Sequence, residues 1–220
     1  HIMKHTIKNI MASSVALLAL TASSGWAGVT EEISTLQKRW AEVNYQMEGE
    51  AQSEAFASLA TEADAVVSRH PDNAAPLIWR GIIKSTYAGA KGGLGALSLA
   101  KSSKADLEAA LAIDPQALDG SAYTSLGTLY CHVPGWPIGF GDDKKAEKLL
   151  LKALAINPDG IDSNYFYADY LIGKKRYQDA RTYLLKAKTA APRINRPLAD
   201  AGRQKEISQA LAVIEQKLGS

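Results

Sequence analysis

The sequence predicts an all-α protein built from repeated helix pairs, and three observations support this fold class. Alanine and leucine are abundant while runs of β-branched residues are scarce, which favours helices over strands. Segments with apolar residues at three- and four-residue spacing, typical of amphipathic helices, recur along the chain. Four of them are closed by a proline, at Pro71, Pro115, Pro158 and Pro192. Proline stops a helix because it lacks the backbone donor and clashes with the preceding turn.

The spacing of these prolines matches a known helical repeat. Successive prolines lie 44, 43 and 34 residues apart. The shortest separation equals one tetratricopeptide repeat, about 34 residues, and the other two exceed it by about ten. In the third unit, Tyr123, Leu126, Gly127 and Tyr130 stand at the W-x-x-L-G-x-x-Y spacing of that repeat. We therefore expect about four tetratricopeptide-like helix pairs, followed by a C-terminal helix that covers the open end of the stack.

Each expected helix has a place in this scheme. Helices at 52–69, 95–113, 143–156 and 176–190 are the second helices of the pairs, because each precedes one of the four prolines. Helices at 30–47, 74–90, 119–132 and 161–173 are the first helices of the pairs. Gly81, Gly127 and Ala168 mark the point where three of them closely approach their partner helices. The helix at 198–218 follows the last proline and is the expected cap.

The N-terminal 27 residues have the three-part pattern of a secretory signal peptide. Two lysines precede an apolar run at 10–22, and small residues then predict cleavage after Ala27. The apolar run is too short to cross a bilayer, which needs about 20 residues. A buried N-terminal helix is the alternative. We expect residues 1–27, which begin with a cloning remnant, to be removed, and residues 28–220 to form a single domain in the periplasm.

Composition and charge disfavour several classes of function. The chain has 25 basic and 23 acidic residues, and two lysines leave with the leader, so the mature chain is formally neutral. That balance offers no general electrostatic case for nucleic acid. Cys131 is the single cysteine, and on a helix it points about 100° away from His132, which suits a zinc pair poorly. We find no catalytic constellation, and expect no enzyme activity, no metal and no cofactor.

Seven extra residues separate the two helices of the third unit when it is compared with the fourth. The segment reads CHVPGWPIGFGDDK (131–144), in which Pro134 and Pro137 exclude a helix. We expect an ordered loop in which Trp136, Ile138 and Phe140 are buried against the array. Two interpretations stay open: the loop is a structural plug between units, or it lines the mouth of a ligand or partner site.

The first helices of tetratricopeptide units line the concave face of the array. Alignment of the units predicts a face of small, apolar and hydroxyl-bearing residues: Ile78, Ile82, Ser85, Thr124, Thr128, Cys131, Tyr165 and Asp169. A concave surface of this kind favours an apolar ligand or peptide segment, unless neighbouring helices fill the hollow. The residues expected to contact a ligand are Trp79, Ile82, Tyr123, Trp136, Ile138, Phe140, Tyr165 and Phe166.

Charged residues cluster around the start of the last helix. Arg193, Arg196 and Arg203 surround Asp200 there. One interpretation is a surface ion-pair network that fixes the terminal helix. The other is that the three arginines bind a partner or an anion.

Four segments together carry a resemblance to a known family: LDGSAYTSLGTLY (118–130), VPGWPIGFGD (133–142), AEKLLLKALAINPDGIDSNYFYADYL (146–171) and RINRPLADAGRQKEI (193–207). They resemble the secreted tetratricopeptide-like proteins related to the T component of tripartite, periplasmic-binding-protein-dependent (TRAP) transporters, a group that includes bacterial sterol-transport proteins. The likeness covers roughly residues 75–215. T components of the best-described type are lipoproteins that assemble into a ring, whereas this chain lacks the lipobox cysteine, so its oligomeric state is left open.

The resemblance implies a non-enzymatic periplasmic component of a transport pathway. Such a component would carry a hydrophobic ligand, a lipid or sterol, or meet a periplasmic binding protein, and association with the outer membrane is left open. The alternative function is a scaffold that docks an envelope protein and has no small-molecule site.

Overall fold

In the computed structural model, which describes residues 14–219, nine helices follow one another without a strand among the described residues. They form the expected all-α, tetratricopeptide-like repeat array. The helices are α1 (Ser14–Gln46), α2 (Gly49–Arg69), α3 (Ala74–Lys91), α4 (Gly93–Ile113), α5 (Ala117–His132), α6 (Asp143–Ile156), α7 (Ile161–Gly173), α8 (Tyr177–Lys188) and α9 (Pro197–Gly219). The four repeat prolines follow the ends of α2, α4, α6 and α8, as predicted.

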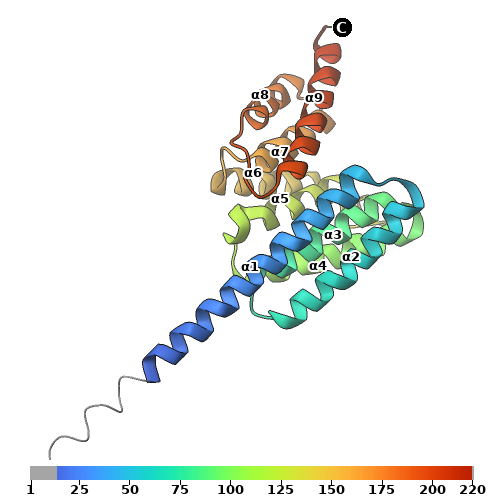
Figure 1. Cartoon of the computed structure of the whole chain (residues 1–220). Coiled ribbons are helices and arrows are strands. Elements are labelled where there is room, and N and C mark those ends of the chain that lie inside the picture. Colours follow the sequence, from blue (N-terminus) through green and yellow to red (C-terminus); the bar gives the residue numbers. More distant parts are fainter. Residues whose placement is uncertain (1–13, 220) are drawn as a thin grey trace, which may run out of the picture.

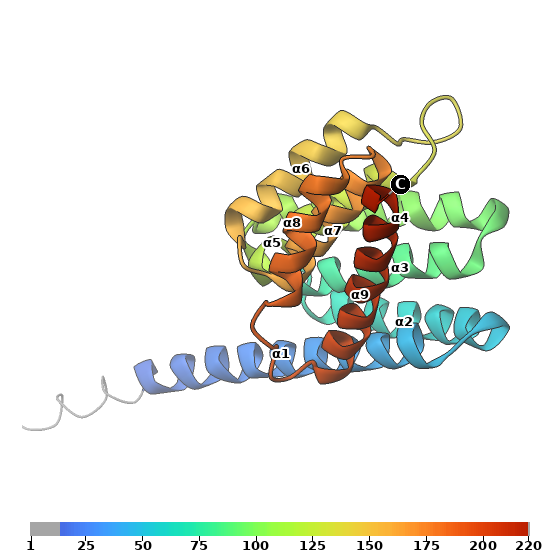
Figure 2. The ribbon, with the colours of Figure 1, turned by 90° about the horizontal axis from the view of Figure 1, so that it is seen from above.

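The helices pack as neighbouring pairs in chain order, α1 with α2, α3 with α4, α5 with α6 and α7 with α8 (Figure 1). The terminal helix α9 packs on α7 and α8 at the end of the array, as expected of a cap. It also contacts α1, the first helix (Figure 2). Because α9 joins the last pair to the first, the concave side of the array is partly closed.

Two glycines explain the close contact within pairs. A Cβ atom placed on Gly81 of α3 would lie 2.8 Å from Cγ of Leu107 on α4. A Cβ on Gly127 of α5 would lie at the same distance from Cγ of Leu150 on α6. In α7, the equivalent Ala168 is fully buried. The close approach predicted at Gly81 and Gly127 is therefore confirmed, and the burial of Ala168 is consistent with an equivalent position in α7.

The first helix is longer than expected. We expected it to begin near residue 30, but α1 begins at Ser14 and continues through the predicted cleavage point at Ala27. Its N-terminal part projects from the rest of the fold (Figure 1), and Val29 is the first of its described side chains that is buried. Residues 1–13 of the predicted leader lie outside the described residues. Cleavage after Ala27 would leave the packed part of α1 intact.

The start of α5 also differs from the expectation of regular helix from residue 119. Leu118, Asp119 and Gly120 have φ angles of 49°, 56° and 75°, so they form a left-handed turn before the regular helix. Gly120 suits this turn, because a Cβ there would lie 3.0 Å from the Ile156 side chain. The two residues before it adopt the same conformation at a steric cost.

The loop between α5 and α6 is ordered, as expected, but most of it is not buried. It is closed on itself by hydrogen bonds, since the Gly141 amide donates to the Pro134 carbonyl at 2.9 Å. The tip therefore projects beyond the helices (Figure 2). Trp136 is 90% exposed and Ile138 69% exposed, so the prediction that they are buried is wrong. Of the three large side chains, only Phe140 packs on the array, with its ring 5.4 Å from the Tyr130 ring.

Candidate functional site: the cavity on the concave face

A cavity of about 420 Å³ lies where α3, α5 and α7 stand side by side. The three helices are the first members of successive pairs, so their concave sides face the same space. The cavity is lined by Ile82, Ser85, Thr86 and Gly89 of α3, by Ser121, Thr124, Ser125, Thr128, Leu129 and His132 of α5, and by Asp162, Tyr165, Phe166 and Asp169 of α7. Its volume lies in the range of small-molecule sites, about 300–1,000 Å³.

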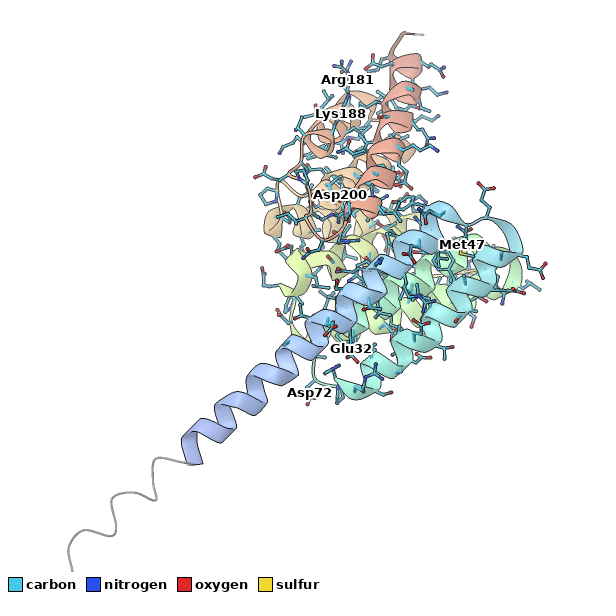
Figure 3. All side chains as sticks on the ribbon, viewed as in Figure 1. Glu32, Met47, Asp72, Arg181, Lys188 and Asp200 are labelled. Atoms are coloured by element: carbon cyan, nitrogen blue, oxygen red, sulfur yellow. The ribbon has the colours of Figure 1, made fainter. Side chains whose placement is uncertain are left out.

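Two helices outside the concave face complete the walls. The first helix α1 contributes Trp40 and Asn44, and α9 contributes Arg203 and Glu206. Figure 3 labels Asp200 near the start of α9, where this helix approaches α1. The terminal helix therefore covers part of the hollow, but a cavity remains. Trp40 was missed by sequence reasoning because no repeat motif places α1 beside the groove.

Six of the eight residues predicted for the concave face line the cavity. They are Ile82, Ser85, Thr124, Thr128, Tyr165 and Asp169. The other two do not line it. Ile78 is fully buried in the core, and Cys131 is half-buried and packs against the core.

Two aromatic pairs form apolar walls. Trp40 and Trp79 pack edge to face with ring centres 5.8 Å apart, and the indole of Trp40 also donates to the Thr86 hydroxyl at 3.0 Å. On α7, the rings of Tyr165 and Phe166 lie 5.2 Å apart. Both pairs line the cavity.

Two of the three clustered arginines belong to an ion-pair network, in agreement with the first interpretation of this cluster. Arg203, which is only 7% exposed, donates to Asp162 at 2.9 Å and to Glu206 at 2.6 Å. Arg193 donates to Asp162 at 2.7 Å and to Asp200 at 2.6 Å. Asp162 thus links α7 to α9 through two guanidinium groups.

The charge of Asp162 is maintained by this network. Burial alone would raise the pKa of its carboxyl, but the attraction of Arg203 and Arg193 outweighs burial and holds the pKa well below its ordinary value. Burial likewise opposes the charge of Arg203, and Asp162 in turn raises the pKa of that guanidinium. Arg203 also lies over the rings of Tyr165 and Phe166, at 4.5 and 4.6 Å from their centres. The carboxylate of Asp162 and the guanidinium of Arg203 therefore stabilise each other within the fold.

Arg196 differs from its two neighbours. Its guanidinium carbon lies 5.0 Å from the centre of the Trp79 ring, and it makes no ion pair with another described residue. Burial, followed by repulsion from Arg193, lowers its pKa to about 10, so it is still a cation at neutral pH. It lines the cavity and also a second one of about 570 Å³. Trp79 and Asp162 line both cavities as well.

At the opposite part of the cavity, His132 of α5 pairs with Asp169 of α7, with Nε2 and Oδ2 2.7 Å apart. This hydrogen bond raises the pKa of His132 above its ordinary value. The neighbouring Cys131 is a neutral thiol, since burial raises its pKa to about 11. Within residues 14–219, no group of three or more His, Cys, Asp or Glu side chains is arranged to hold a metal ion.

The predicted ligand residues divide into two groups. Trp79, Ile82, Tyr165 and Phe166 line the cavity. Tyr123, Trp136, Ile138 and Phe140 line neither of the two cavities. Tyr123 lies one position before Thr124, so the helical turn directs it away from the cavity, and Lys152 of α6 lies over its ring at 5.3 Å. The other three belong to the projecting loop.

Comparison with known proteins does not assign the chain to a family. No protein-family model matches the chain, and no curated protein matches it. In the part of the chain that the structure describes, no helix is both long and apolar enough to cross a bilayer.

Proposed function

We propose that this chain is a non-enzymatic periplasmic component of a transport pathway, and that it holds an apolar small molecule, a lipid or sterol, in the cavity between α3, α5 and α7. The observation that carries the proposal is a cavity of small-molecule size between two aromatic pairs, Trp40 with Trp79 and Tyr165 with Phe166. Flat apolar rings offer a large contact area to a rigid or extended hydrocarbon.

The hydroxyl groups on the concave face support an apolar ligand. Thr86 donates to the Ile82 carbonyl at 2.7 Å, Ser85 donates to the same carbonyl at 2.9 Å, and Thr128 donates to the Thr124 carbonyl at 2.8 Å. These donors are satisfied within their own helices. The face is therefore less polar towards a ligand than its composition suggests, because an apolar ligand leaves none of these three hydroxyl protons unpaired.

The carboxylates of the cavity support a binding role over acid–base chemistry. Asp162 and Glu206 accept from Arg203, and Asp169 is paired with His132. Each carboxylate that lines the cavity is thus engaged by a cationic or titratable partner. A general base accepts a proton at a lone pair directed at the substrate, and in each of these three carboxylates at least one oxygen is already engaged by its partner.

A fluorescence titration of the wild-type chain and two variants tests the proposal. Cholestanol and dodecanoate, added to the purified chain, are expected to change the emission of Trp40 and Trp79 in a saturable way. Ser125 lies on α5 within the cavity, so Ser125→Phe should fill the space and abolish binding. Trp136→Ala is the control, because Trp136 lies outside both cavities and its removal should leave the affinity unchanged.

Two results would contradict the proposal. One is the absence of saturable binding by any sterol or fatty acid in wild-type protein. The other is binding that survives Ser125→Phe but is lost in Trp136→Ala, which would locate the ligand on the loop.

The exposed loop favours a second candidate function, the docking of a periplasmic binding protein or another envelope protein. Trp136 and Ile138 are exposed at its tip, and exposed aromatic residues are enriched at protein interfaces. If this scaffold function is correct, Trp136→Asp abolishes complex formation with the periplasmic binding protein that co-purifies with the wild-type chain. Complex formation that survives Trp136→Asp would argue against docking through the loop.

A further inference from the structure

We propose that the ligand is held at one end by an uncharged oxygen, a hydroxyl or a carbonyl, which accepts hydrogen bonds from the guanidinium of Arg196. This inference rests on the proposed function, since it assigns the polar end of the same apolar ligand. It makes Arg196 a residue for ligand recognition, in contrast to Arg193 and Arg203.

The first step is the location of unsatisfied groups. Among the described residues, three buried side-chain nitrogen or oxygen atoms lack a hydrogen-bond partner: Trp79 Nε1, Arg196 Nε and Asn164 Oδ1. The first two are both donors and lie together, since the Arg196 guanidinium covers the Trp79 ring at 5.0 Å. Trp79 is only 3% exposed. Buried donors are rarely left unpaired, so these two donors favour an acceptor as the group that binds beside them.

The second step is the contrast between neighbouring arginines. Arg193 and Arg203 each donate to two carboxylates. No described residue accepts a hydrogen bond from the guanidinium of Arg196, although it lines both cavities. The same sequence region therefore contains two arginines that fix α9 to α7 and one whose guanidinium has no hydrogen-bond acceptor among the described residues.

The third step concerns the charge of the missing acceptor. Arg193, Arg196 and Arg203 are matched in number by Asp162, Asp200 and Glu206, which the network places among them. An anionic head group would add a fourth negative charge beside Asp162, whose low pKa keeps it ionised. An uncharged oxygen replaces the hydration that Arg196 loses on burial without this repulsion. A neutral acceptor therefore suits the site better than a carboxylate.

The arrangement also orients the ligand. The oxygen end lies beside Arg196 and Trp79, at the junction of the two cavities. The apolar body extends from there along the hydroxyl face of α5, between the Trp40 and Tyr165 walls. His132 lies on the last turn of α5, at the far end of this path.

Matched ligands test the inference in wild-type protein. Cholestanol, cholestanone and cholestane share one ring skeleton. Cholestanol carries a hydroxyl, cholestanone carries a carbonyl and cholestane has no oxygen. Displacement of a fluorescent sterol should show that the first two bind about tenfold or more tightly than cholestane, because hydrogen bonds to charged groups are among the stronger ones. Dodecanol should bind more tightly than dodecanoate.

Variants assign this preference to Arg196. Arg196→Met keeps an unbranched side chain but no donor, so it should reduce the affinity for cholestanol to that for cholestane and leave cholestane unchanged. Arg196→Lys keeps donors and charge, and should retain part of the preference. Arg181→Met is the matched control, since Arg181 pairs with Glu215 on the surface of α8 and α9; it should change nothing.

The possible failures can be told apart. If no probe binds wild-type protein, the proposed function is wrong. If cholestane binds as tightly as cholestanol, the proposed function stands and the role of Arg196 is wrong. Tighter binding of dodecanoate than of dodecanol, lost in Arg196→Met, would overturn the uncharged head group. The wild-type ligand comparison decides the question even if Arg196→Met fails to fold.

Discussion

The close contact between paired helices makes a quantitative prediction at Gly127. Replacing Gly127 by alanine adds a Cβ at 2.8 Å from Cγ of Leu150 and 3.2 Å from the carbonyl oxygen of Ala146. Carbon atoms pack best at about 3.5–4.0 Å, so α5 and α6 must separate or Leu150 must leave its rotamer. Overpacking of this kind costs about 1–3 kcal/mol, and the better helix propensity of alanine returns about 1 kcal/mol.

A second glycine provides the matched control. Gly89 also lies in a helix, α3, but a Cβ there meets nothing within 4 Å. Gly89→Ala should therefore stabilise the fold by up to about 1 kcal/mol through propensity alone, while Gly127→Ala should destabilise it by about 1 kcal/mol. Urea unfolding followed by circular dichroism measures both free energies, and the two variants should differ by about 2 kcal/mol.

A double variant tests whether Leu150 is the cause. Leu150→Ala alone should cost about 2–5 kcal/mol, and Gly127→Ala added to it should then stabilise, because the Cβ enters the space that Leu150 leaves. If Gly127→Ala stabilises the wild-type protein as much as Gly89→Ala does, α5 and α6 are not packed as closely as described. The repeat register derived from Gly81, Gly127 and Ala168 would then be wrong.

Three further predictions concern the network, the cavity end and the left-handed turn. Arg203→Met should lower the unfolding free energy by about 3–5 kcal/mol in urea, since it leaves the buried Asp162 under-compensated; a loss below about 1 kcal/mol would contradict the structural role of this ion pair. The hydrogen bond with Asp169 raises the pKa of His132, so its stabilisation should be complete below about pH 6.5, the ordinary value, and should disappear as pH rises through the folded-state pKa. NMR titration should show the His132 pKa above 6.5 in wild type and lower in Asp169→Asn; equal values in the two proteins would exclude this cause. Asp119→Gly should raise the unfolding free energy by about 0.5 kcal/mol, because glycine relieves the positive φ but adds entropy to the unfolded chain; a lower melting temperature would refute the strain at this turn.

Local sequence patterns were sufficient to predict the fold and the side of the cavity that the concave face forms. The signals that predict the fold act within one helix or one helix pair, so they can be detected without coordinates. They are the prolines that end helices, the helical spacing of apolar residues, and the glycines at 81 and 127. The same periodicity placed Ile82, Thr124 and Tyr165 on the concave face. The misassigned loop residues show where this reasoning ends: alternation with glycine and proline predicts an ordered loop, but whether Trp136 is buried depends on hydrogen bonds that close the loop on itself.

The sequence by itself determined which segments are helices, how they pair and which sides of α3, α5 and α7 face inwards, because those properties depend on neighbours three or four residues apart. Only the tertiary structure decided that α1 and α9 close the hollow, that Trp40 joins Trp79 in its wall and that Arg196 pairs with no carboxylate among residues 14–219. Asp162 and Arg203 lie 41 positions apart, and Tyr45 and Glu206 lie 161 apart. Contacts of such separation depend on how the whole array curves, and no local pattern encodes which charges will meet.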